Sequence, residues 1–166
     1  ISFDPNIRLP LWSSAEACQE TVREFLPDAD LVKLSDEECF FVTGKHSILD
    51  AADWLFEQGC KMVLYSMGKE GAMILTPHFS SHVENPEVRV KDTTGAGDAI
   101  IGAYLYCLAK NHITVSQLAD CLPEQVQEWL TFAVYYANYS ITKSGAIASY
   151  PDYTTSVSYT HLTLPT

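Results

Sequence analysis

The sequence contains little positive charge. Its 10 lysines and arginines stand against 21 aspartates and glutamates, which gives a formal net charge of −11 at pH 7. Nucleic acids are bound mainly through clusters of basic side chains that displace counterions from the phosphates. The composition therefore argues against a nucleic-acid partner. A small phosphate ligand, in contrast, requires only local amide donors and a metal ion.

The sequence also lacks a long apolar run, a signal-like start and paired cysteine motifs. Its longest apolar run, Ala99 to Ala109, is far shorter than the roughly 20 residues that cross a bilayer. The first residues, ISFDPN, carry neither a basic region nor a hydrophobic stretch. The five cysteines form no Cys-x-x-Cys pair and are typical of reduced thiols: Cys18, Cys39, Cys60, Cys107 and Cys121. We therefore expect a cytoplasmic protein that does not bind membranes.

Predicted strands alternate with predicted helices along the chain. Short apolar runs predict strands at residues 1–4, 30–34, 61–66 and 72–76, and one or two more within 77–90. Capping residues and apolar periodicity predict helices at residues 13–27, 35–44, 47–59, 99–111 and 123–144, with a weaker one near 115–122. Capping boxes are expected for Ser13 with Glu16 and for Ser35 with Glu38. This alternation predicts an α/β domain with a largely parallel sheet.

The stretch TGAGD, residues 94–98, leads directly into an apolar helix. Gly95, Ala96 and Gly97 present almost no side chain, so an anion can approach the free N–H groups of the helix start. The helix dipole favours the ionised form of Asp98, which suits a general base that takes a proton from an attacking hydroxyl group. A glycine turn before a helix is also a common structure without any ligand. The spacing matches neither the Walker motif nor the dinucleotide fingerprint.

The longer stretch DTTGAGDAIIGAYL resembles the C-terminal signature of the ribokinase-like (pfkB) carbohydrate kinase family. FDPNIRLPLW and SAEA are similar to its fructokinase branch, and DADLVKLSDEE, VLYSMGKEGAMI and KSGAIASYP are similar to later family segments. The resemblance covers residues 1–153 and corresponds to the C-terminal, ATP-binding and catalytic portion of a family member. It implies a ribokinase-like three-layer α/β/α sandwich with a mostly parallel sheet, from which the N-terminal strands and the lid are missing.

The resemblance also implies a role for particular residues. Asp98 would be the general base, and Gly95, Ala96 and Gly97 would form the anion hole. ATP would lie against Ser66, Gly68, Gly71 and Gly97. A monovalent cation such as K⁺ would bind near Asp92, Thr94, Gly145 and Ser149, and Glu38 would act through water on Mg²⁺ and phosphate.

Simpler interpretations remain open for several of these residues. The capping box already explains Glu38, and Gly68 and Gly71 fit an ordinary hairpin turn. Asp92 is also a typical turn residue, and Ser149 a loop hydroxyl. Two residues depart from the family pattern, which often has asparagine at the positions of Ser35 and Val134. The second departure leaves the nucleotide preference open.

The resemblance implies that the full-length protein phosphorylates a sugar hydroxyl with ATP, as a fructokinase converts fructose to fructose 6-phosphate. The alternatives are a non-catalytic nucleotide-binding or regulatory fragment, and a family kinase for another sugar or a nucleoside. We expect the isolated chain to be inactive, because the family holds the sugar mostly through its N-terminal half. Full-length family members often form homodimers through the lid. Residues 154–166 lack charge and amphipathic periodicity, and we expect a tail that is disordered or foreign to the domain.

Overall fold

The computed structural model describes residues 1–163 and contains one five-stranded sheet. Its strands follow each other in chain order: β1 (Ser2–Phe3), β2 (Leu31–Ser35), β3 (Met62–Ser66), β4 (Ala72–Leu75) and β5 (Ser80–Val83). Strands β1, β2 and β3 are parallel, and the pairs β3–β4 and β4–β5 are antiparallel. Only β4 therefore runs against the others, and the prediction of a mostly parallel sheet is confirmed.

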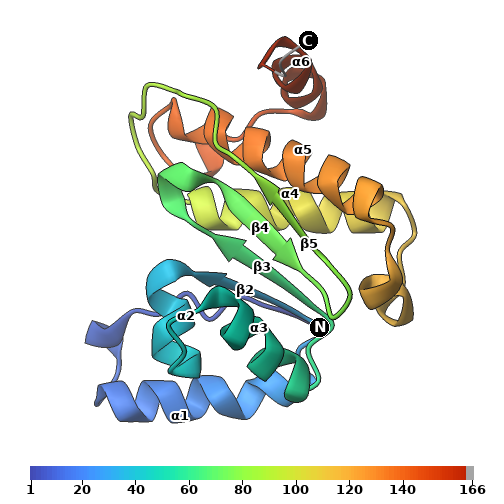
Figure 1. The fold of residues 1–166 in the computed structure, drawn as a ribbon. Helices are drawn as coiled ribbons and strands as arrows, with labels where there is room; N and C mark the ends of the chain where they lie inside the picture. The colour runs from blue at the N-terminus through green and yellow to red at the C-terminus, as the bar shows by residue number, and fades with distance from the viewer. Residues whose placement is uncertain (164–166) are drawn as a thin grey trace.

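Helices cover both faces of this sheet and give the three layers seen in Figure 1. One face carries α1 (Ala15–Phe25), α2 (Asp36–Thr43) and α3 (Ile48–Glu57), and the other carries α4 (Ala96–Lys110) and α5 (Pro123–Ile141). The strands supply both cores by alternation. Leu31 and Leu64 pack with α4 and α5, whereas their neighbours Val32 and Val63 pack with α1, α2 and α3.

The helix starts follow from capping side chains, with one correction to the sequence prediction. The cap of α1 is Ser14, whose Oγ accepts from the Ala17 N–H at 3.1 Å, and not Ser13 paired with Glu16. Two adjacent serines offer the same chemistry, so the sequence alone does not separate them. The capping box of Ser35 and Glu38 on α2 is confirmed, and Ser47 caps α3.

The remaining segments differ in detail from the predictions. The helix predicted to start at Ala99 begins three residues earlier, and the weak helix near 115–122 is a 3₁₀ helix over Val115–Asp120. Shorter 3₁₀ helices span Leu9–Leu11, Leu26–Asp28, Gly68–Glu70 and Ile147–Ser149. In the part of the chain from residue 1 to 163, no helix has both the length and the hydropathy of a membrane span.

The segment that we expected to be disordered or foreign to the domain contains a helix, α6, which spans Tyr153–Thr163. Asp152 Oδ1 accepts from the Thr155 N–H at 2.7 Å and acts as a cap that the sequence analysis did not weigh. The Tyr159 ring also packs edge-on against Tyr139, with 5.3 Å between the ring centroids. Residues 164–166 lie outside the described residues, and a foreign origin of the tail stays a prediction.

Candidate active site

The first turn of α4 lines a cavity with Gly95, Ala96, Gly97 and Asp98. Gly95 is the N-cap in the left-handed conformation, with φ +78° and ψ 7°, and Ala96 is the first helical residue. The Ala99 N–H donates to the Gly95 carbonyl at 2.8 Å, which closes the first helical hydrogen bond. The N–H groups of Gly97 and Asp98 lie within this turn and have no intrahelical carbonyl to bond. The turn is therefore able to bind an anion.

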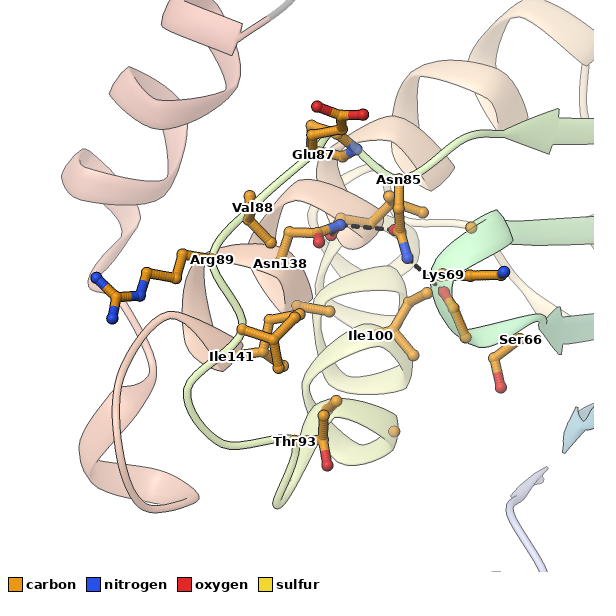
Figure 2. Close-up of a pocket in the computed structure, with 18 residues that line it drawn as sticks. Ser66, Lys69, Asn85, Glu87, Val88, Arg89, Thr93, Ile100, Asn138 and Ile141 are labelled. Carbon is orange, nitrogen blue, oxygen red and sulfur yellow. Dashed lines mark hydrogen bonds between the residues drawn. The ribbon is translucent and has the colours of Figure 1, made fainter.

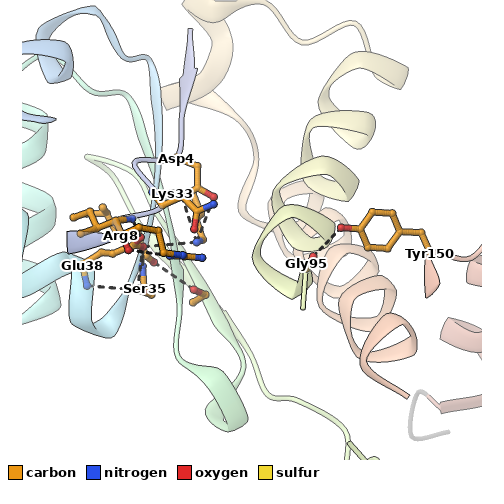
Figure 3. A network of polar contacts seen from close by, with 11 residues as sticks. Asp4, Arg8, Lys33, Ser35, Glu38, Gly95 and Tyr150 are labelled. Atoms are coloured by element: carbon orange, nitrogen blue, oxygen red, sulfur yellow. Dashed lines mark hydrogen bonds and ion pairs between the residues drawn. The ribbon is translucent and has the colours of Figure 1, made fainter. Parts of the chain in front are cut away.

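Close neighbours explain why this turn must be built from small residues. A Cβ atom on Gly95 would lie 2.7 Å from the Tyr150 hydroxyl oxygen and 2.9 Å from the Ala146 Cβ. The Tyr150 hydroxyl donates to the Gly95 carbonyl at 2.9 Å and holds the turn in place, as Figure 3 shows. A Cβ on Gly97 would lie 3.2 Å from the Lys33 Nζ. The glycines therefore allow the α4 turn to approach both Tyr150 and Lys33.

Lys33 is a functional candidate that the sequence analysis missed. It lies on β2 with a side chain only 6% exposed, and its Nζ is 3.3 Å from Asp4 Oδ2 and 3.7 Å from Glu38 Oε2. Figure 3 shows the three charged groups beside the turn at Gly95. The available signal was one lysine within the otherwise apolar stretch LVKL, residues 31–34. A buried lysine requires such partners, and its contact with Gly97 places positive charge at the anion-binding turn.

Glu38 accepts hydrogen bonds on both oxygens of its carboxylate. Its Oε1 accepts from the Ile7 N–H at 2.8 Å, and its Oε2 accepts from the Ser35 N–H at 2.9 Å and the Ser35 hydroxyl at 3.0 Å. Burial favours the neutral acid, but these donors and the Lys33 charge outweigh it and hold the Glu38 pKa below its ordinary value of 4.5. Burial dominates at Asp4 and raises its pKa. A role of Glu38 toward Mg²⁺ through water stays a prediction.

Asp92 joins the two loops that were expected to hold a monovalent cation. Its Oδ1 accepts from the Thr94 N–H and its Oδ2 from the Gly145 N–H, both at 2.9 Å. The Gly145 amide and the Thr94 donors lower the Asp92 pKa from 3.8 to about 2. Ser149 is buried beside these loops and donates to the Ala146 carbonyl at 2.7 Å.

The oxygen atoms at these loops fit a cation that prefers oxygen ligands. A carboxylate has about four acceptor sites, so two amide donors leave lone pairs on Asp92 for an ion. Within residues 1–163, no group of three or more His, Cys, Asp or Glu side chains can hold a metal ion. Any cation here would therefore depend on Asp92 together with backbone oxygens, as the resemblance implied.

Two cavities meet at the start of α4. The larger, about 990 Å³, is lined by all four residues expected at the nucleotide, namely Ser66, Gly68, Gly71 and Gly97 (Figure 2). The smaller, about 460 Å³, is lined by Asp98, Lys33, Asp4, Glu38 and the same turn. Ser66, Thr93, Ala96 and Gly97 line both cavities. A ligand lying across this shared wall would have the exposed carboxylate of Asp98 beside its anionic end.

Two glycines of the larger cavity have a structural role. Gly71 has φ +97°, and a Cβ atom there would lie 1.9 Å from the Val83 carbonyl oxygen. Only glycine therefore allows β5 to approach this turn. Gly68 has φ +52° with open space around it, so its conformation alone favours glycine. Both features fit a tight hairpin turn and leave a direct nucleotide contact as a prediction.

These features together define a class of protein: an α/β sandwich with a helix start that is able to bind an anion beside a carboxylate. Residues 1–153 match the pfkB family carbohydrate kinase. The chain therefore belongs to the pfkB family of carbohydrate kinases.

Individual relatives agree with this assignment. The chain is 35% identical over 152 residues to fructokinase-2 of Solanum lycopersicum, and the match covers 91% of this chain and 45% of the relative. A solved double-mutant fructokinase from Vibrio cholerae O395, bound to fructose, ADP and potassium ion, is 31% identical with a TM-score of 0.82. That match covers 95% of this chain and 49% of the solved chain. Xylella fastidiosa fructokinase with bound ATP gives 27% identity and a TM-score of 0.89, over 97% of this chain and 51% of that chain. The chain thus spans about half the length of the relatives it matches.

Proposed function

We propose that the full-length protein transfers the γ-phosphoryl group of ATP to a sugar hydroxyl, with fructose as the substrate and fructose 6-phosphate as the product. The single observation that carries this proposal is the placement of Asp98 at the start of α4. Asp98 lines the smaller cavity, and Ala96 and Gly97 of the same turn belong to the wall shared with the larger cavity. The family membership and the fructokinase relatives support the same reaction.

The proposed step moves one proton and one phosphoryl group. Asp98 accepts the proton of the sugar hydroxyl as the hydroxyl oxygen forms a bond to the γ-phosphorus. The bond between the γ-phosphorus and the bridging oxygen breaks, and ADP leaves with the electron pair. The N–H groups of Gly97 and Asp98 and the charge of Lys33 stabilise the negative charge on the transferred group.

The proposed reaction also involves two metal ions. Mg²⁺ bound to ATP would neutralise negative charge on the phosphates, and Glu38 would act on it through water. The loops of Asp92, Thr94, Gly145 and Ser149 would hold a monovalent cation such as K⁺. In this chain, Asp92 keeps the two loops together through its bonds to the Thr94 and Gly145 amides.

The replacement Asp98→Asn in the full-length protein tests the assignment. We expect the rate of sugar phosphorylation to fall by about 10²- to 10⁴-fold, the usual contribution of a general base. ATP affinity should remain, because the amide donors are unchanged. Asp53→Asn is the matched control, since Asp53 is an exposed helical carboxylate on α3, across the sheet from α4.

The measurement combines single-turnover kinetics with ATP binding by calorimetry, using a panel of sugars that includes fructose. Full activity of Asp98→Asn would refute the role of Asp98. ATP binding by the wild-type protein without turnover of any sugar would favour a nucleotide-binding module. Turnover of a different sugar would replace fructose and leave the mechanism in place.

A further inference from the structure

The segment that follows β5 forms one wall of the larger cavity. Residues 85–90 all line this cavity, and Figure 2 shows them running beside α5 toward Thr93. Within the described residues 1–163, residues 86–90 take part in no hydrogen bond and no ion pair. The position of this wall therefore depends on the anchors at the two ends of the 85–90 segment.

Both anchors lead to α5, but they differ in kind. After the segment, the backbone N–H groups of Lys91 and Asp92 donate to the Ile141 carbonyl at 2.8 and 3.2 Å. At its start, the Asn138 Nδ2 donates to the Asn85 Oδ1 at 2.6 Å. The first anchor uses only backbone groups, whereas the second requires the side chain of Asn85. A substitution of Asn85 alone should therefore release one end of the segment.

The same amide also holds the opposite wall of the cavity. The Asn85 Nδ2 donates to the carbonyl of Gly68, which starts the 3₁₀ turn Gly68–Glu70. This turn lines the cavity through Gly68 and Lys69. An asparagine amide has both donors and an acceptor, so Asn85 bonds the turn and α5 at once. The turn keeps another bond without Asn85, because the His82 Nε2 lies 3.0 Å from the Glu70 carbonyl oxygen.

We infer that Asn85 is a positioning residue for the nucleotide, because its amide joins the Gly68 turn to Asn138 and fixes the distance between two walls of the larger cavity. The inference rests on the proposed function, since it requires a nucleotide in this cavity. A cavity that is already ordered binds a ligand more tightly than one that must be ordered on binding. Asn85 does not line the smaller cavity beside Asp98. Its loss should therefore weaken nucleotide binding and leave the transfer step unchanged.

The replacement Asn85→Leu in the full-length protein removes both hydrogen bonds at a similar side-chain volume. ATP affinity, measured by calorimetric titration, should fall about five- to tenfold, as expected for one or two lost hydrogen bonds. The kcat at saturating ATP and sugar should change by less than about twofold. Asn111→Leu is the matched control, since the Asn111 Nδ2 donates to the Cys107 carbonyl at 2.8 Å but lies outside the cavity. Unchanged ATP affinity in Asn85→Leu, or an equal fall in kcat, would overturn the inference.

Limited trypsin digestion tests the anchoring without any nucleotide. Arg89 is exposed within the 85–90 segment, and cleavage after it depends on how often the segment opens. Asn85→Leu should raise this cleavage rate about fivefold or more, and Asn111→Leu should not. Equal rates in Asn85→Leu and the wild type would overturn the inference alone. A wild-type protein that binds no ATP would overturn the proposed function and the inference together.

Discussion

The replacement Gly95→Ala should disrupt the anion-binding turn for two separable reasons. The new methyl group would lie 2.7 Å from the Tyr150 hydroxyl oxygen and 2.9 Å from the Ala146 Cβ, so the Tyr150 ring must move. Moving the ring breaks its hydrogen bond to the Gly95 carbonyl. The left-handed conformation at φ +78° is also unfavourable for alanine.

The size of the effect follows from these two contributions. A left-handed alanine costs roughly 1–2 kcal/mol, and the lost hydrogen bond costs about 1 kcal/mol. We therefore expect Gly95→Ala to lower the free energy of unfolding by about 2–3 kcal/mol. Gly44→Ala is the matched control, because Gly44 has φ +74° and a methyl group there would meet no atom within 4 Å. This control should show the conformational cost alone, about 1–2 kcal/mol.

Urea unfolding of the full-length protein measures both variants, and ATP titration measures the anion-binding turn directly. Gly95→Ala should also weaken ATP binding, because the amides of the first turn shift with the loop, whereas Gly44→Ala should not. The reasoning fails if both variants lose the same stability and both keep wild-type ATP affinity. That result would mean that Tyr150 does not constrain the turn.

Two further predictions concern charged groups. Lys33→Met should lower the free energy of unfolding by roughly 3–5 kcal/mol, because Asp4 and Glu38 lose their buried partner; unchanged urea unfolding would contradict this. Asp92 has a lowered pKa, so its stabilising contribution is complete above its ordinary value of 3.8 and is lost as the pH falls toward about 2. Asp92→Asn should remove that pH dependence, measured by unfolding at a series of acidic pH values; an identical pH profile in the variant would refute the assignment.

The sequence predicts what depends on local chemistry. Short apolar runs located the strands, and the Ser35–Glu38 capping box located α2. The small residues before Asp98 indicated a helix start, and α4 begins at these residues; their binding of an anion stays a prediction. These features depend on neighbours within a few positions along the chain.

Contacts between residues that are far apart in the sequence could not be predicted from the sequence. Lys33 meets Gly97 and Asn85 meets Asn138 only because the sheet and α5 bring them together. The choice between Ser13 and Ser14 as a cap depends on backbone angles that either serine can adopt. The Tyr159 ring of α6 packs against Tyr139, a contact that the composition of the tail did not reveal.

A crystal structure of the full-length protein with a non-hydrolysable ATP analogue and fructose tests the central claim most directly. We predict that the γ-phosphate accepts hydrogen bonds from the N–H groups of Gly97 and Asp98, with the Asp98 carboxylate within about 3 Å of a sugar hydroxyl. A γ-phosphate bound away from the start of α4, or an Asp98 carboxylate turned away from the sugar, would contradict the account.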